Sequence, residues 1–461
     1  MTRKEIFDIL DRAKSVFFTG IGGISMSSIA FVLSARGKNV AGSDRAENDM
    51  TKKLISSGIS VFHGHDAKNV VNYDAVVYTG AVDFSNPELS EALKRGIPVI
   101  YRADALAYLM QTYKNRIGVS GSHGKSTCTA MISHIFVSAG NDPCVMCGAT
   151  LPELSSAYRV GGGDDFIFEA CEYKDSFLEF LPSIAVILNI DVDHTDYFTG
   201  GIEQIKTSFE KYAAIPFECS ENPLVVSNAD DENTVSALSD TEKTTFGIKE
   251  NADFRAVNIS SENGHAVFDI LKHGNFLCHV KLKVPGEHNI YNALAAAICA
   301  DFCGISSEAT GKALSDFCGI ERRFQLMGSV GGADVYIDYA HHPREIAASL
   351  SAAREIDRDG KLYCIFEPHT FSRTAALFDD FVNVFSAADK TLFVDIYAAR
   401  EVNVSGVDSR MLAEKTRNGE YACSYADAAE KMRSYAKKGD IILILGAGTV
   451  NEIASLLCDK Q

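Results

Sequence analysis

The chain has 461 residues, of which 46% are hydrophobic and 23% charged, a composition typical of a globular α/β protein with several cores. Its formal net charge of −17 argues against non-specific nucleic-acid binding, because a polyanion would be repelled. No run in the sequence approaches the roughly 18 apolar residues that cross a bilayer, so we expect no membrane segment. Twelve cysteines without a secretory segment indicate the reducing cytoplasm.

The first predicted elements are a strand at 16–19, a glycine turn and a helix at 26–36. The turn holds Gly20, Gly22 and Gly23, and the next strand ends at Asp44. Glycines at such a turn let the backbone approach a phosphate, and Asp44 stands near the spacing of a ribose-binding acid. A dinucleotide site is the conventional interpretation, but the final glycine of that motif is missing. The residues alone therefore indicate a phosphate-bearing ligand.

A second turn of this kind is the most specific motif in the chain. It lies between a strand at 116–120 and a helix at 128–139, and it consists of Gly121, Ser122, His123, Gly124, Lys125, Ser126 and Thr127. Backbone N–H groups and the helix N-terminus would bind phosphate, and Lys125 would add a mobile positive charge. A hydroxyl at the helix start would reach Mg²⁺. Two residues separate the glycines, where a Walker loop has four, so the pattern predicts a shortened loop that binds ATP.

Acidic side chains follow the next two apolar strands. Glu169 and Glu172 come after a strand at 166–168, and three acids with His194 come after a strand at 185–190. Carboxylates at strand ends, near a phosphate loop, are placed to hold Mg²⁺. A solvated acidic loop is the alternative interpretation, and His194 would be an unusual ligand for so hard a cation.

The next region combines an insertion with the start of an apolar helix. Short alternating segments in 253–284 predict antiparallel strands in the middle domain. His288, Asn289 and Asn292 precede a helix at 293–300, and the two asparagines can share one face. Their spacing leaves open both helix capping and recognition of a planar base.

Polar clusters follow three strands in the last third of the chain, at 338–343, 366–374 and 395–401. A third glycine turn follows a strand at 441–445. Clusters at one edge of a parallel sheet favour a single functional site.

The order of these motifs resembles the Mur ligase family of peptidoglycan precursor synthesis over essentially the whole chain. The motifs that carry the resemblance lie at 20–27, 121–127, 169–173, 189–194, 288–292, 322–324, 338–343 and 368–374. The resemblance implies an α/β protein of three domains. These are a Rossmann-like UDP-sugar-binding domain at 1–113, a central P-loop-type ATPase domain with a parallel sheet plus a small antiparallel sheet at 114–320, and a C-terminal Rossmann-like amino-acid-binding domain at 321–461.

The resemblance also implies roles for individual residues. The UDP-sugar pocket would be lined by Gly20, Gly22, Gly23, Asp44, His65, Thr79, Arg102 and Glu172. The loop at 121–127 would hold the ATP phosphates, and the remaining ATP contacts would come from His288, Asn289, Asn292, Arg322, Arg323 and Asp338. Magnesium would lie near Ser126, Glu169 and His194. The catalytic groups would be Lys125, His342 and Arg373.

The implied activity is that of a cytoplasmic, ADP-forming carboxylate–amine ligase that uses ATP and Mg²⁺. Its members closest in motif pattern join L-alanine to the carboxylate of UDP-N-acetylmuramate through an acyl phosphate. The alternatives are a ligase that adds a preformed peptide to the same sugar in wall recycling, a folylpolyglutamate-type ligase, a nucleotide-binding regulatory protein without turnover, and an NAD-dependent dehydrogenase. We expect a monomer or homodimer with no nucleic-acid or membrane partner.

Two features depart from patterns found in relatives. Ser25 and Ser28 replace glycines that are common in the first turn of the family. Some members carry a carbamylated lysine beside a second magnesium, and here Phe209 stands at that position, so we expect no carbamate.

Overall fold

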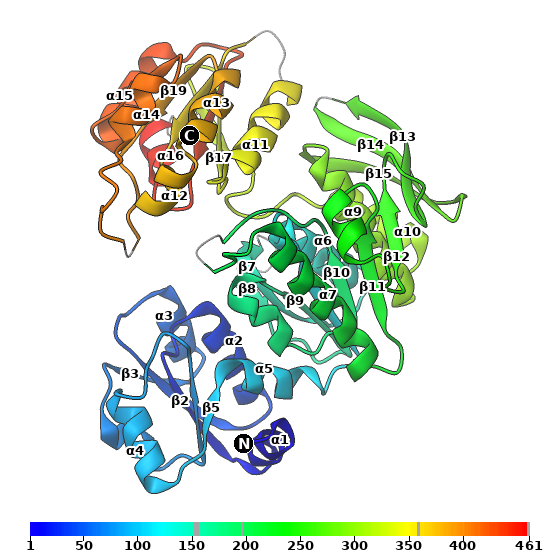
Figure 1. Ribbon diagram of the computed structural model, residues 1–461, viewed down its shortest axis with the longest axis vertical. Helices are drawn as coiled ribbons and strands as arrows, with labels where there is room; N and C mark the ends of the chain where they lie inside the picture. Colours follow the sequence, from blue (N-terminus) through cyan, green and yellow to red (C-terminus); the bar gives the residue numbers. More distant parts are fainter. Residues whose placement is uncertain (152–155, 195–196, 263, 357–359, 400, 459–461) are drawn as a thin grey trace. The chain divides into compact units, whose positions relative to one another are not determined.

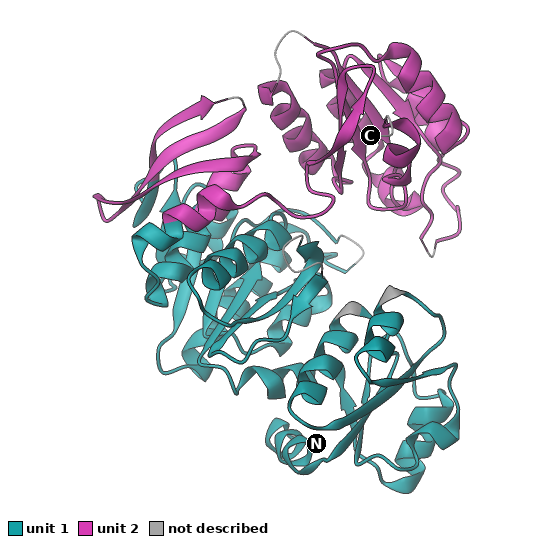
Figure 2. Cartoon of the chain, turned by 180° about the vertical axis from the view of Figure 1, so that it is seen from behind, with its two compact units in different colours: residues 1–255, 294–310 teal, residues 256–293, 311–461 magenta. Residues whose placement is uncertain are grey.

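The computed structural model describes residues 1–151, 156–194, 197–262, 264–356, 360–399 and 401–458. The chain divides into two compact units, Met1–Arg255 with Leu294–Thr310 and Ala256–Ala293 with Gly311–Gln461 (Figure 2). Among the described helices, none combines the length and the apolar character that crossing a bilayer requires. The domain boundaries at 113 and 320 stay a prediction.

The first sheet is parallel, with strand order β3-β2-β1-β4-β5. Figure 1 labels β2, β3 and β5 of this sheet. Its strands are β1 (Ser15–Thr19), β2 (Asn39–Asp44), β3 (Ser60–His63), β4 (Ala75–Tyr78) and β5 (Val99–Tyr101). Its helical elements are α1 (Arg3–Arg12), α2 (Ile24–Ala35), α3 (Asp49–Ser56), η1 (Ala67–Val70), α4 (Pro87–Arg95) and α5 (Arg102–Met110).

Alternation along β1 explains why helices cover both faces of this sheet. Val16 and Phe18 lie in one hydrophobic cluster with residues of α1, α2 and α5. Phe17 points the other way, into a cluster with residues of η1 and α4. The chain order reverses at β1, which lies between β2 and β4. In open parallel sheets, ligands bind outside the carboxyl ends of the strands at such a reversal.

The second sheet has β6 near its centre, and in the first unit its strands run in the order β12-β11-β10-β6-β9-β7-β8. Only β7 and β8 of this series pair antiparallel. The strands are β6 (Asn115–Ser120), β7 (Cys144–Leu151), β8 (Ser156–Arg159), β9 (Asp165–Glu169), β10 (Ile184–Ile187), β11 (Leu224–Asn228) and β12 (Thr244–Gly247). The helical elements between them are α6 (Lys125–Ser138), η3 (Tyr173–Glu179), α7 (Ile202–Cys219) and α8 (Glu232–Ala237).

The antiparallel insertion predicted from alternation is confirmed. Strand β13 (Phe254–Glu262) begins parallel to β12, and β14 (His265–Lys272) pairs antiparallel with β15 (Asn275–Pro285). Two helices follow, α9 (His288–Phe302) and α10 (Ser307–Asp316).

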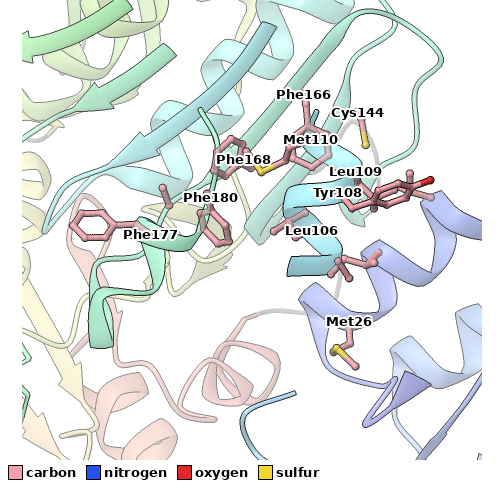
Figure 3. Packing of buried hydrophobic residues seen from close by; sticks show 14 of the residues in the cluster. Met26, Leu106, Tyr108, Leu109, Met110, Cys144, Phe166, Phe168, Phe177 and Phe180 are labelled. Atoms are coloured by element: carbon pink, nitrogen blue, oxygen red, sulfur yellow. The ribbon is translucent and has the colours of Figure 1, made fainter. Parts of the chain in front are cut away.

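One hydrophobic core joins the first two sheets. It contains residues from α1, α2 and α5 together with Phe166 and Phe168 of β9 and aromatic residues of η3 and α7. Figure 3 shows Met110 at the end of α5 lying against Phe166 and Phe168. Phe31 of α2 also stacks on Tyr158 of β8, with ring centroids 4.7 Å apart. The first unit therefore contains two sheets that share one buried apolar cluster.

The third sheet, in the second unit, runs β16-β17-β21-β18-β19-β20, with only β16 antiparallel to its neighbour. Its strands are β16 (Gln325–Val330), β17 (Ala333–Asp338), β18 (Leu362–Phe366), β19 (Lys390–Phe393), β20 (Gly419–Tyr421) and β21 (Ile441–Leu445). Its helices are α11 (Pro343–Ile356), α12 (Phe371–Ala376), α13 (Phe378–Val384), α14 (Ser409–Lys415), α15 (Tyr425–Tyr435) and α16 (Glu452–Leu457). Ile442 and Ile444 lie in one core cluster and Leu443 and Leu445 in another, so β21 is buried on both faces. The structure thus confirms the predicted α/β fold.

Candidate active site

The first glycine turn is fixed to the end of β2. The amides of Gly20 and Ile21 both donate to the carbonyl of Ser43 at 2.9 Å, and the amide of Gly22 donates to Asp44 Oδ2 at 2.8 Å. A Cβ atom on Gly22 would lie 2.8 Å from the same oxygen, so a larger residue here would displace the Asp44 carboxylate. Helix α2 starts directly after the turn without a side-chain cap, which leaves its first amides directed at the space where a phosphate would bind.

The other residues predicted for the UDP-sugar gather at the same edge of the first sheet. His65 follows β3, Thr79 follows β4, and Arg102 begins α5 directly after β5. Arg102 Nη1 donates to Ser25 Oγ at 2.8 Å, so one of the serines that departs from the family pattern contacts a predicted site residue. A Cβ atom on Gly20 would lie 2.8 Å from Thr79 Cγ2, which shows how closely the turn approaches the end of β4.

A buried carboxylate that we did not predict from the sequence holds side chains in place at this edge of the first sheet. Glu88 of α4 has a fully buried side chain, and its Oε2 lies 2.7 Å from Ser43 Oγ and 3.1 Å from His65 Nδ1. Asn69 Nδ2 donates to its other oxygen at 2.9 Å. These contacts fix one ring nitrogen of His65 inside the protein. The only signal in the sequence is an acid in the first turn of a helix, which usually indicates a capping role.

The second glycine turn forms a cradle between β6 and α6. Gly121 and Gly124 have φ values of 141° and 87°, in the region that favours glycine. Asn189, which follows β10, braces the turn from outside. Its side chain accepts from the amide of His123 at 2.8 Å and donates to the carbonyl of His123 at 3.0 Å, and its own carbonyl accepts from the amide of Ser122 at 3.1 Å. The turn is therefore shaped by the neighbouring strand before any ligand binds.

Lys125 is the first residue of α6 and bends back over this turn. Its Nζ donates to the carbonyls of Gly121 at 2.5 Å and Ser122 at 3.2 Å, and it pairs with Glu172 Oε2 at 3.0 Å. Burial opposes the charge on the ammonium group, but the nearby carboxylates, Glu172 first among them, outweigh it and raise the pKa of Lys125. Glu172 was expected among the UDP-sugar residues, and the structure puts it beside the lysine of the phosphate loop.

Two of the three predicted magnesium residues are connected through Cys147. Glu169 Oε1 accepts from the amide of Gly148 at 2.5 Å and lies 3.1 Å from Cys147 Sγ, and the same sulfur lies 3.6 Å from the carbonyl of Ser126. A carboxylate and a hydroxyl are hard oxygen donors, the kind that Mg²⁺ prefers, so Ser126 and Glu169 fit this cation. Mg²⁺ keeps several waters and needs few protein ligands.

His194, the third predicted magnesium residue, also lies near Glu172. Its Nε2 is 3.8 Å from Glu172 Oε1, and its ring is 4.7 Å from the ring of Tyr173. Within the described residues, no three His, Cys, Asp or Glu side chains form a ready metal cage. Asp196, the last acid of the predicted cluster, lies outside the described residues. Phe209, at which we expected no carbamate, is buried against Phe177.

The asparagines predicted to meet adenine are bonded within their own helix start. Asn289 Nδ2 donates to the carbonyl of Pro285 at 2.7 Å, and Asn292 Nδ2 donates to Asn289 Oδ1 at 3.0 Å. Both are buried, whereas His288 is exposed. In this arrangement both side-chain amides are engaged at the first turn of α9, and neither of these bonds is a helix cap, so capping and base recognition both stay predictions.

At the carboxyl edge of the third sheet, residues that are far apart in the sequence of the second unit lie close together in space. Arg322 donates through Nη2 to the carbonyls of Gly446 at 2.8 Å and Gly448 at 2.9 Å, so it is bound to the third glycine turn. Its burial lowers its pKa. Arg322 and Arg323 both lie over the ring of Tyr339, at 4.9 and 5.2 Å from its centroid.

Asp338, at the end of β17, is buried at the same edge. It accepts from the amide of Ala340 at 2.9 Å and from Ser349 Oγ at 2.8 Å. Burial raises the pKa of this carboxyl group. The predicted cluster at 338–343 therefore begins with a buried acid whose two carboxylate oxygens each accept a hydrogen bond.

Two histidines meet beside Arg373 at the ends of β17 and β18. The rings of His341 and His369 are 5.7 Å apart, and Arg373 Nη1 lies 3.3 Å from His369 Nδ1. Burial first, then the neighbouring His341 and Arg373, lower the pKa of His369 to about 4, and burial also lowers the pKa of His341. Both rings are therefore neutral near pH 7. His342, half-buried, accepts from the amide of Arg344 at 3.4 Å.

The third polar cluster, at 395–401, is only partly described, because position 400 lies outside the described residues. Tyr397 stacks on His369 with ring centroids 5.6 Å apart, and Glu401 accepts from the amide of Ser372 at 2.9 Å. The three clusters that the sequence predicted at one sheet edge thus contact one another.

Comparison with known proteins identifies the family of these features. Residues 15–114 match the Mur ligase family, catalytic domain; residues 119–300 match the Mur ligase middle domain; and residues 322–448 match the Mur ligase, glutamate ligase domain. A UDP-N-acetylmuramate–L-alanine ligase of Caldicellulosiruptor saccharolyticus is 45% identical over 452 residues, covering 96% of this chain and 98% of the relative. A protein of the same name from Clostridium novyi is 42% identical over 457 residues, covering 98% of each. The solved UDP-N-acetylmuramate–alanine ligase of Thermotoga maritima superposes with a TM-score of 0.79 at 27% identity, covering 97% of this chain and 98% of that one.

Proposed function

The chain belongs to the Mur ligase family, and on that premise we propose that it joins L-alanine to the carboxylate of UDP-N-acetylmuramate, converting ATP to ADP and phosphate. The observation that carries this proposal is the loop from Gly121 to Lys125, shaped by Asn189 and carrying a charged lysine at the start of a helix. A protein that only binds a nucleotide has no need for a lysine directed along a phosphate-binding turn.

The UDP-sugar is assigned to the carboxyl edge of the first sheet. The uncapped start of α2 and the turn held by Asp44 suit the diphosphate, and Arg102 supplies a positive charge. His65, with one ring nitrogen held by Ser43 and Glu88, presents its other nitrogen to the nucleotide.

In the first chemical step, a carboxylate oxygen of the sugar attacks the γ-phosphorus of ATP. The bond from that phosphorus to the bridging oxygen breaks, and ADP leaves with the electron pair. Two anions must approach each other, so the ammonium group of Lys125 and the amides of the cradle lower the barrier chiefly by neutralising charge. Bound Mg²⁺, held by Ser126 and Glu169, would supply further charge neutralisation on the phosphates.

In the second step, the amine of L-alanine attacks the carbonyl carbon of the acyl phosphate, and inorganic phosphate leaves. The amine must lose a proton, and we assign this role to His342 in the second unit. Arg373, beside the neutral rings of His341 and His369, is a suitable partner for the carboxylate of the amino acid. Because burial keeps those two rings uncharged near pH 7, Arg373 provides most of the positive charge in that cluster.

The test is phosphate release from ATP in the presence of UDP-N-acetylmuramate, with L-alanine, L-serine, glycine or a tripeptide as the amine. Release that depends on L-alanine supports the proposal. Release that requires the tripeptide would identify a recycling ligase, and release without any amine would indicate a plain ATPase. A shift in NADH fluorescence without phosphate release would identify a dehydrogenase.

A further inference from the structure

Directly after Glu172 the chain makes a turn that ordinary residues avoid. Lys174 and Asp175, neither of them glycine, both have left-handed backbone conformations, with φ of 56° and ψ of 32° and 21°. Two consecutive non-glycine residues in this region are strained, and such strain persists only where the surroundings hold it. The amide of Asp175 donates to the carbonyl of Glu172 at 2.9 Å, so the turn is bonded directly to the main chain of Glu172.

The side chain of Asp175 holds this turn from two directions. One carboxylate oxygen accepts a hydrogen bond from the phenol of Tyr197 at 2.6 Å. The other accepts from the hydroxyl of Ser208, which lies on α7. One acid therefore ties the strained turn both to a long helix and to a second loop.

That second loop carries His194. His194 has a φ of 52°, and its carbonyl accepts from the amides of Tyr197 and Phe198 at 2.9 Å each. The ring of Tyr173 lies against His194 at 4.7 Å and against Tyr197 at 6.4 Å. His194 thus has a strained backbone conformation and its Nε2 lies 3.8 Å from Glu172 Oε1, and the hydrogen bond from Tyr197 to Asp175 joins this part of the chain to the turn after Glu172.

We propose that Asp175 is a positioning residue for phosphoryl transfer: its bonds to Tyr197 and Ser208 hold the Glu172 and His194 loops in register around Lys125. The inference rests on the proposed function, because it takes Lys125 as the group that meets the ATP phosphates. The side-chain hydrogen bonds of Asp175 go to Tyr197 and Ser208, outside the loop at 121–124. Without this brace, the strained turn relaxes, Glu172 moves, and the ammonium group of Lys125 loses the partner that fixes its direction.

The first test measures whether the hydrogen bonds of Asp175 hold the neighbouring backbone in place, and it does not require turnover. Backbone hydrogen exchange is followed in the full chain for wild type, Tyr197→Phe and Ser208→Ala. Tyr108→Phe is the matched control, because it removes a tyrosine–aspartate hydrogen bond of 2.7 Å, to Asp11, far along the chain. We expect exchange in peptides covering 172–179 and 197–201 to become about tenfold faster in both variants and to stay unchanged in the control. Unchanged exchange in Tyr197→Phe would overturn the proposal.

The second test measures the consequence for catalysis. Asp175→Asn keeps a residue that tolerates the left-handed conformation but weakens the acceptor, and Tyr197→Phe removes only the phenol oxygen. We expect kcat to fall about tenfold in each, with the KM for L-alanine within about twofold of wild type and the control unaffected. Faster exchange with unchanged kcat would remove Asp175 from the positioning role. A wild-type chain without ligase activity would overturn the proposed function, whereas the exchange result would stand by itself.

Discussion

The carboxylate of Glu172 lies 3.0 Å from the ammonium group of Lys125, and both side chains are largely buried. The pair is therefore a buried ion pair, in which each charge depends on the other because neither can be fully hydrated. A lysine that is held in this way remains charged and directed along the phosphate turn. Removing one partner leaves the other charge buried and unpaired, whereas removing both charges does not.

Replacing Lys125 with alanine is expected to lower kcat about a hundredfold or more, because a charge that stabilises the transition state is removed. It also leaves Glu172 buried without its cation, which is expected to lower the free energy of unfolding by about 3 kcal/mol. In the double variant with Glu172→Gln, stability should return while activity stays low. Phosphate release and chemical denaturation measure the two effects, and near-normal turnover of Lys125→Ala at saturating ATP would exclude the assigned role.

Glu88→Gln is expected to act on the UDP-sugar alone. The substitution keeps the size of the side chain but replaces an acceptor that serves Ser43, His65 and Asn69 with a group that also donates. The KM for UDP-N-acetylmuramate should rise about tenfold, while the KM for ATP stays near wild type. The control is Glu91→Gln, one turn along the same helix, where the acid pairs with Arg95. Equal effects on both substrates would show that Glu88 serves the general fold.

Gly148→Ala is expected to change the requirement for magnesium without unfolding the chain. A Cβ atom there would lie 2.8 Å from Glu169 Oε2, the mobile end of a side chain, so the carboxylate should move away. Displacing a proposed ligand in this way should raise the Mg²⁺ concentration for half-maximal activity about tenfold. Gly162→Ala is the control, since its added atom would make an ordinary contact of 3.4 Å with Asp142. An unchanged Mg²⁺ titration would remove Glu169 from the proposed site.

His369→Asn is expected to flatten the dependence of stability on pH. The pKa of His369 is lowered to about 4 in the folded protein, below the value of about 6.5 for an unfolded histidine. Between those values the unfolded chain binds more protons, so the folded state loses stability as the pH falls from about 6.5 to about 4. The melting temperature of the variant should therefore fall less than that of wild type over this interval. Parallel curves would show that this histidine does not titrate differently on folding.

The parts of the site that depend on neighbouring residues could be predicted from the sequence. The turns after β1, β6 and β21 were identified because their glycines stand close together in the chain, and in the turn after β6 a lysine and hydroxyl residues follow directly. The acids at the ends of β9 and β10 were found for the same reason. The antiparallel β14 and β15 were predicted because alternation is also a local pattern.

The parts that depend on strand order could not be predicted in the same way. Lys125 and Glu172 are 47 residues apart, and they meet because β9 lies beside β6. Ser43 and Glu88 are 45 residues apart and meet only when α4 covers the first sheet. For Asn289 and Asn292, the spacing allowed either capping or base recognition, and the observed bonds to Pro285 and between the amides decide how the side chains point.

The stacking of Phe31 on Tyr158 and the shared cluster around Met110 restrict how this protein can be recombined. A chimera that takes its first 113 residues from a relative would bring in a new surface for α2 and α5, opposite Tyr158 and the aromatic residues of β9 that pack on the present one. Such an exchange would leave an apolar gap or a clash at the junction unless both sides were taken together. The two sheets of the first unit are therefore exchanged most safely as a single block.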